Sequence, residues 1–275
     1  MTANHHAMDS SAYLNRLHAD SAALLAAARL HAEPPIPAVL SCPGWRLTDL
    51  VLHLGAVHRH TTRIVANHER EHVPISPADL GWLDLEQPYL HWLASEQAPA
   101  SEPLPPYVLD WFARGAARME DTLRAADPDE PIWTWSPDKR VAHYPRMMAI
   151  ETAIHRWDAQ HALGGAEPID GALARDAIDH AFDVMLPARR AWKEPRAGAG
   201  ETYHFYQTDG GGEWLVRFNP AEVTVRRERG DGDVSVRGAA SDLLLFLWRR
   251  IPAGQLEIAG DASLLDRFFE LVPPR

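Results

Sequence analysis

The sequence predicts an α+β protein in which a bundle of long helices is followed by a small α+β domain. The first part of the chain contains long segments whose apolar residues recur with helical spacing. The last part contains short β-rich segments separated by turns. The break KEPRAGAG at residues 193–200 lies between them, so we expect one domain over residues 1–197 and a second over residues 198–275.

The first part has several segments with the length and periodicity of amphipathic helices. The first segment ends before Pro34-Pro35, the second follows the turn Pro43-Gly44, and the fourth is closed by Gly164-Gly165. The predicted helices cover residues 9–31, 47–68, 107–126, 141–163 and 171–192. The proline-dotted residues 73–105 are expected to hold only short helical pieces, such as residues 90–94.

The last part alternates strands with turns and adds two short helices. The predicted strands cover residues 203–208, 214–218, 222–226, 234–237 and 256–258, and the helices cover residues 241–250 and 264–271. The run DGGG at residues 209–212 lies between two strands and lacks the Lys-Ser/Thr pair that follows in a phosphate-binding loop. A hairpin turn is therefore predicted there.

The charge balance argues against several classes of partner. The chain has 27 basic and 38 acidic residues, a net charge of −11, and its basic residues do not cluster. Neither nucleic acid nor an anionic membrane is therefore an expected partner. The single cysteine, Cys42, excludes an intrachain disulfide and favours a reducing, cytoplasmic location. The N-terminus MTANHHAMDS resembles neither a signal peptide nor a membrane span.

The predicted helix over residues 141–163 carries a possible metal-binding pair. Glu151 and His155 are four residues apart, and together with Asp158 they lie on the border of the apolar face. The apolar face comprises Met147, Ile150, Ile154 and Trp157, and the opposite, polar face comprises Thr152, Arg156 and Gln160. On this helix alone, a solvated surface pair and half of a metal site are equally good interpretations.

A histidine on the second predicted helix favours the metal site. His53 lies on the border of its own apolar stripe, and border positions on facing helices of a bundle converge on one interior site. Two histidines and one carboxylate suffice for catalytic zinc and leave a fourth position open, although the same donors also suit iron(II) or nickel. His60 lies two turns further along the helix, too far from His53 to share one ion.

Two short motifs in this order carry a resemblance to a known family. The turn Cys42-Pro43-Gly44-Trp45 is followed by TDLVLHL at residues 48–54, and ETAIHRWD occupies residues 151–158. Together they resemble the DinB-like mycothiol-dependent maleylpyruvate isomerase family over essentially the whole chain. The resemblance implies a DinB-like four-helix bundle with a divalent metal, zinc by preference, on His53, Glu151 and His155. Asp158 is then expected to accept a hydrogen bond from a ligand histidine.

The resemblance also implies an enzyme that uses mycothiol or a similar small thiol as cosubstrate. A metal-bound thiol is deprotonated, which supplies a nucleophile that the chain's one cysteine would not have to provide. We expect S-transfer to an electrophilic small molecule. The alternatives are cis–trans isomerisation of maleylpyruvate and a non-catalytic module that binds a small apolar ligand.

An arginine near the C-terminus is a further candidate. Members of the family carry a pocket-facing arginine late in the chain, commonly after glycine, and this chain has Arg249-Arg250 in the matching segment. Arg250 is the aligned candidate for contact with an anionic substrate. An arginine at a helix C-terminus is also favoured by the helix dipole alone. Trp45 is interpreted as an anchor of its turn and Cys42 as an inert small residue.

Overall fold

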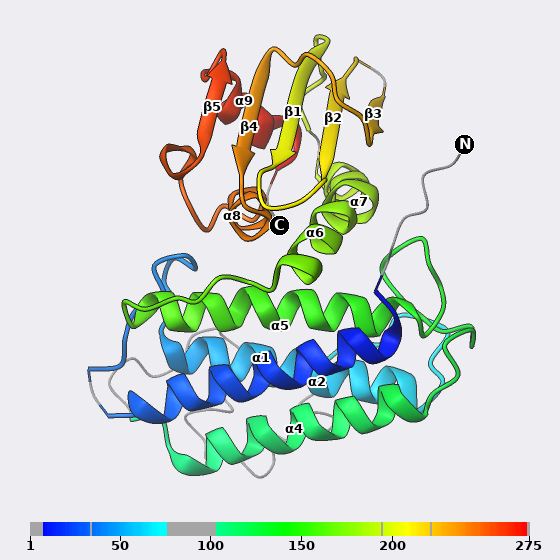
Figure 1. Cartoon of the computed structure of the whole chain (residues 1–275). Helices are drawn as coiled ribbons and strands as arrows, with labels where there is room; N and C mark the ends of the chain where they lie inside the picture. The colour runs from blue at the N-terminus through cyan, green and yellow to red at the C-terminus, as the bar shows by residue number, and fades with distance from the viewer. Residues whose placement is uncertain (1–7, 34, 76–102, 194, 221, 274–275) are drawn as a thin grey trace. The chain divides into compact units, whose positions relative to one another are not determined.

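The computed structural model describes residues 8–33, 35–75, 103–193, 195–220 and 222–273. Its α+β architecture confirms the predicted fold class (Figure 1). The contacts divide the chain into two compact units, of which one spans Met8–Glu167 and the other begins at Pro168. The short helical piece expected at residues 90–94 lies outside the described residues.

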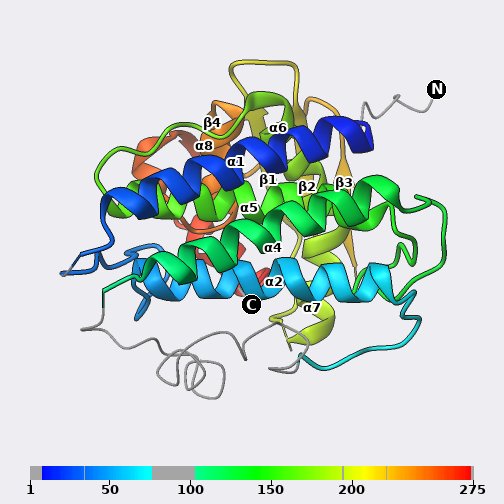
Figure 2. The same ribbon diagram turned by 90° about the horizontal axis from the view of Figure 1, so that it is seen from below.

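The first unit is the predicted four-helix bundle. It is built from α1 (Ser10–Leu30), α2 (Leu47–Ala66), α4 (Pro106–Ala125) and α5 (His143–Ala162). In the bundle α1 packs against α4 and α5, and α2 also packs against both (Figure 2). Within the described part of the chain, no helix is both long and apolar enough to cross a membrane.

The helix ends follow from local sequence. The Asp9 carboxylate caps α1 by accepting from the backbone N–H of Ala12 at 2.7 Å. At the start of α2, the Asp49 carboxylate accepts from the backbone N–H of Arg46 at 2.7 Å. After α5, Gly164 takes a positive φ of 81° and closes the helix, as the Gly-Gly pair predicted.

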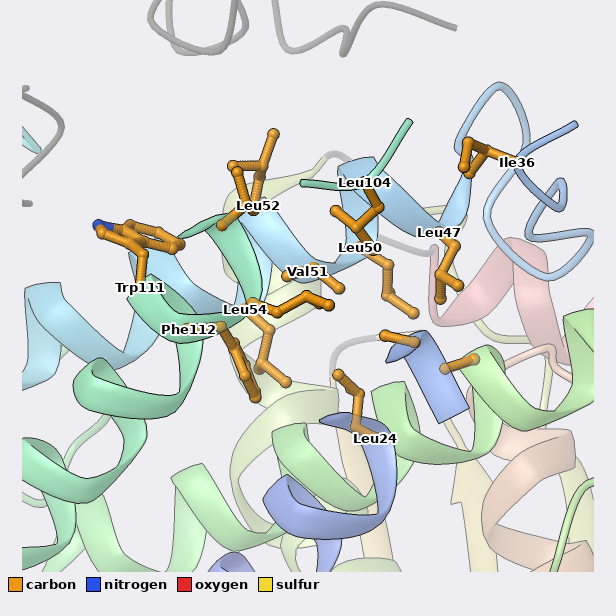
Figure 3. Close-up of a cluster of buried hydrophobic side chains, with 14 of the residues drawn as sticks. Leu24, Ile36, Leu47, Leu50, Val51, Leu52, Leu54, Leu104, Trp111 and Phe112 are labelled. Atoms are coloured by element: carbon orange, nitrogen blue, oxygen red, sulfur yellow. The ribbon is translucent and has the colours of Figure 1, made fainter. Parts of the chain in front are cut away.

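Buried apolar side chains from all four helices and from the segments before α2 and α4 form one core of the bundle (Figure 3). The α2 helix supplies the largest share of this cluster, including Leu50 and Leu54, both of which are fully buried. Gly55 brings α2 close to α4, because a Cβ at this position would overlap the indole ring of Trp111. This close packing of the α2 backbone against the Trp111 ring holds α2 against α4 by apolar contact alone.

The α5 helix is buried on more sides than its sequence pattern predicted. Thr152 and Arg156, which lie opposite the apolar face in the helical pattern, are 0% and 3% exposed. Arg156 donates from Nε to Asp20 Oδ1 of α1 at 2.9 Å, and from a terminal nitrogen to Gln160 Oε1 at 2.8 Å. These side chains are buried because they find polar partners on neighbouring elements, which periodicity alone does not reveal.

The second unit consists of a five-stranded sheet and helices. Its elements are α6 (Gly171–His180), the π-helical turn η2 (Ala181–Met185), α7 (Leu186–Trp192), β1 (Glu201–Gln207), β2 (Glu213–Phe218), β3 (Val223–Arg226), β4 (Val234–Gly238), α8 (Ala240–Leu247), the 3-10 turn η3 (Ala253–Gln255), β5 (Glu257–Gly260) and α9 (Leu264–Leu271). The strand order is β3-β2-β1-β4-β5. Strands β1 and β4 are parallel and the other pairs antiparallel, and β1 and β2 form the hairpin around DGGG.

The segment from α6 to α7 packs against other elements of the second unit. Phe182 of η2 lies 5.3 Å from Phe205 of β1 between ring centroids, and α6 packs against α8. The contacts therefore change at Glu167–Pro168, whereas the sequence pattern changes after residue 197. Pro187 accounts for the π turn, because its ring would clash with the carbonyl of residue 183 in a regular helix.

Candidate metal centre

The structure brings the three expected ligand residues together. His53 extends from α2, and Glu151 and His155 lie one turn apart on the same side of α5. Glu151 Oε1 is 3.4 Å from His53 Nε2 and 3.3 Å from His155 Nε2. One donor atom from each residue lies within 4.8 Å of the others, so the three residues form a compact group of possible metal ligands.

The cluster lies at the edge of the bundle. The side chain of His155 is 8% exposed, that of Glu151 22% and that of His53 30%. The ligand set is therefore held by the bundle on one side and keeps contact with solvent on the other. A small molecule can approach such a cluster without unfolding of the helices.

A fourth side chain orients His155. Asp158, which is fully buried, lies one turn further along α5, and its Oδ2 is 2.9 Å from His155 Nδ1. The Ser41 hydroxyl donates to Asp158 Oδ1 at 2.6 Å, and the Cys42 thiol lies 3.7 Å from Oδ2. An acceptor at Nδ1 selects the tautomer whose Nε2 lone pair faces Glu151, as in the carboxylate–histidine pairs of metalloenzymes.

The loop before α2 carries these supporting groups to α5. Gly44 takes a positive φ of 87°, and the backbone N–H of Trp45 donates to the Cys42 carbonyl at 2.9 Å. The turn thereby directs the side chains of Ser41 and Cys42 toward Asp158. The sequence interpretation of Cys42 as inert missed this contact, although the position of the turn just before the helix of His53 is a signal that could have indicated it.

Trp45 covers part of the cluster. Its ring centroid is 4.9 Å from that of His53 and 6.4 Å from that of His155. The residue is half-buried, so it anchors the turn as expected and also shields two ligand imidazoles from water. The second role was not predicted, because it depends on how the turn lies against α5.

The charges in the cluster are strongly coupled. Burial raises the pKa of Glu151, but hydrogen bonds from His155 and His53 outweigh it and hold that pKa well below its ordinary value of 4.5. Burial lowers the pKa of His155, but hydrogen bonds to Asp158 and Glu151 outweigh it and raise that pKa to about 9. Without a metal ion, His155 is therefore a cation between two carboxylates at neutral pH.

The donor spacing fits a metal ion. Ligand bonds of about 2.05 Å in a tetrahedral site place neighbouring donors about 3.3 Å apart. The two distances to Glu151 Oε1, 3.3 and 3.4 Å, agree with that value. They are longer than the roughly 2.7–2.9 Å of a hydrogen bond between an imidazolium and a carboxylate. Two imidazoles and one carboxylate also match the three protein ligands of a catalytic zinc site.

The predicted arginine lies in the other unit. Arg250 follows α8, is half-buried and donates to the Trp248 carbonyl at 3.0 Å. Arg249 adopts a positive φ of 58°, while the N–H of Arg250 donates to the Leu245 carbonyl at 2.7 Å and closes the helix. This is the left-handed position that glycine favours at a helix end. The role of Arg250 remains a prediction.

Two features define the class of protein. They are a DinB-like helical bundle that carries a histidine–carboxylate cluster, and a small α+β unit that follows it in the sequence. The model of the mycothiol maleylpyruvate isomerase N-terminal domain matches residues 14–160, and that of the MDMPI C-terminal domain matches residues 172–267. The chain therefore belongs to the mycothiol-dependent maleylpyruvate isomerase family, a family of thiol-dependent enzymes.

Solved structures share the fold over nearly the full length. A crystal structure of the mycothiol-dependent maleylpyruvate isomerase matches with a TM-score of 0.61 and 13% identity, over 93% of this chain and 95% of that chain. A histidine-to-alanine mutant of such an isomerase matches with a TM-score of 0.59 and 14% identity, over the same shares. Identities this low show the fold alone. A comparison with curated protein sequences gives no match.

Proposed function

We propose that the chain binds one divalent metal ion, zinc by preference, through His53, Glu151 and His155 and uses it to activate a small thiol of the mycothiol type. The observation that carries this proposal is the arrangement at His155, whose two ring nitrogens each face a carboxylate oxygen. Asp158 takes the Nδ1 proton, so Nε2 and Glu151 Oε1 face each other across a position that must hold positive charge, a proton in the metal-free protein or a metal ion in its place. A metal ion supplies that positive charge and leaves room for a further ligand.

The residues of the site then have separate tasks. The bound ion supplies the positive charge that keeps a thiol deprotonated at neutral pH. Asp158 fixes the tautomer of His155, and Glu151 carries the one negative charge among the three ligands. Trp45 excludes water from one side of the imidazoles, which strengthens the electrostatic interactions there.

The fate of the carbon–sulfur bond distinguishes isomerisation from S-transfer. In isomerisation, the sulfur adds to an activated double bond, the resulting single bond rotates and the sulfur leaves, so the thiol is regenerated. In S-transfer, the bond persists and the substrate carbon takes a proton or loses a leaving group. Both family matches support isomerisation of maleylpyruvate as the first candidate. The second candidate is S-transfer to another electrophile, which the altered pair Arg249-Arg250 favours.

Metal analysis tests the ion directly. We expect about one zinc per chain in the wild type after dialysis and little in the His53→Ala variant. His60→Ala is the matched control, because His60 lies on the same helix, half-buried, and outside the cluster. Equal metal in the wild type and in His53→Ala would refute the site.

Product analysis with mycothiol and maleylpyruvate separates the reactions. Isomerisation returns all of the thiol, whereas S-transfer consumes one thiol for each product formed. If Arg250 contacts an anionic substrate, Arg250→Ala lowers turnover while leaving the zinc content unchanged. A chain that binds no metal and turns over neither substrate would fit the non-catalytic binding module instead.

A further inference from the structure

A second polar contact connects the two helices that carry the cluster. His58 of α2 is fully buried, and its Nε2 lies 3.0 Å from the hydroxyl oxygen of Thr152 on α5, which is also fully buried. Thr152 follows Glu151 directly, and His58 shares its helix with His53. The same two helices are therefore joined twice, once at His53–Glu151 and once at His58–Thr152.

His58 is a neutral, incompletely satisfied group. Burial is the largest cause that lowers its pKa to about 3, so the ring carries no charge at neutral pH. Within the described part of the chain its Nδ1 has no hydrogen-bond partner, and its ring packs 5.5 Å from that of Phe112 between centroids. A buried imidazole with one hydrogen bond adds little to stability, because desolvation offsets most of the gain.

The geometry of the two contacts restricts how α5 can move against α2. On α2, His53 and His58 are separated by about 7.5 Å along the axis, whereas on α5 the adjacent Glu151 and Thr152 are about 100° apart around the axis. Two contacts arranged in this way resist both sliding along the axis and rotation about it. A metal site tolerates errors of only about 0.2 Å in its ligand distances.

We infer that His58 is a positioning residue of the metal centre, which acts by holding Thr152 and thereby fixes Glu151 opposite His53. The inference rests on the proposed metal site. His58 makes no contact with the ion or the substrate in this role. Its effect is on the spacing of the ligands, so it should be visible in metal binding and in the geometry of the bound ion.

Matched substitutions at Thr152 test the inference. Thr152→Val removes the hydroxyl and keeps the shape, whereas Thr152→Ser keeps the hydroxyl. We expect the valine variant to bind zinc about tenfold more weakly in chelator competition, as for other groups that orient metal ligands, and the serine variant to retain most of the affinity. The visible absorption of the Co²⁺-substituted protein should change in the valine variant and be restored in the serine variant.

Substitutions of His58 provide a second test of the inference. His58→Leu should weaken zinc binding as much as Thr152→Val, and the double variant should be no weaker than either alone, because both remove the same hydrogen bond. His58→Gln keeps an amide that can hydrogen-bond near the position of Nε2 and should recover part of the affinity. Urea unfolding of each metal-free variant measures stability separately.

The outcomes separate this inference from the metal proposal. If Thr152→Val binds zinc as tightly as the wild type and only its metal-free stability falls, His58 is structural and the inference is overturned. If the wild type binds no zinc, the metal centre itself is refuted and the inference with it. An equal loss of zinc affinity in Thr152→Ser and Thr152→Val would also overturn the inference.

Discussion

Raising the pH from 7 to 9 tests whether His155 must lose a proton before a metal ion can bind. In the metal-free protein the pKa of His155 is about 9, because Asp158 and Glu151 outweigh the effect of burial. A metal ion binds only the deprotonated ring nitrogen, so the proton on Nε2 must leave before the ion can bind. The metal affinity is therefore expected to rise with pH across this interval.

The size of the effect follows from that pKa. At pH 7, with a pKa of about 9, roughly one chain in a hundred has a free Nε2 lone pair. The apparent affinity should therefore rise about tenfold per pH unit above pH 7 and flatten near pH 9, a total gain of about 50-fold. Asp158→Asn keeps an acceptor at Nδ1 but removes its charge, so the rise should occur at lower pH in this variant.

Two measurements check this expectation. Zinc competition with a chelator of known pH dependence gives the affinity from pH 6.5 to 9.5. Calorimetry in buffers of different ionisation enthalpy should show about one proton released per zinc at pH 7.5. A constant affinity between pH 7 and 9, with no proton released, would show that the ring is already neutral and would refute the assignment of the proton to His155.

Three further predictions concern stability. The pKa of His155 lies above its ordinary 6.5, so its contribution to the metal-free fold is complete below pH 6.5 and lost as pH rises through about 9. Urea unfolding should detect a loss of about 3 kcal/mol, and an unchanged unfolding free energy across this range would contradict it. Gly55→Ala should destabilise by about 1–3 kcal/mol in urea unfolding, because the added Cβ overlaps Trp111, whereas Gly171→Ala, with open space, should be nearly neutral. Arg249→Gly relieves a left-handed backbone and should be about 1 kcal/mol more stable than Arg249→Ala in thermal unfolding; the opposite order would refute the strain.

The elements were predictable because their causes are local. Periodicity and a turn before Leu47 predicted α2, and the pair Gly164-Gly165 predicted the end of α5. The division between the units was not predictable in the same way. An amphipathic pattern shows that a helix buries one face, but it does not show what covers that face, so the helices over residues 171–192 resembled further members of the bundle.

The same distinction applies to the site. Glu151, His155 and Asp158 were predictable as a group, because helical spacing alone places them on one side of α5. The contact between Ser41 and Asp158 joins residues separated by 117 positions, and no local pattern indicates it. The contact between His58 and Thr152 was hidden for the same reason.

Polar side chains of α5 reach three different neighbours. Thr152 contacts α2, Arg156 contacts α1, and Asp158 contacts the turn before α2. Such buried groups contribute little net stability, because desolvation offsets much of their hydrogen-bond and ion-pair energy. Their directional geometry instead favours the rotation of α5 at which all three contacts form together. Since Glu151 and His155 are both carried by α5, fixing its rotation is what holds their donor atoms at a spacing suited to a metal ion.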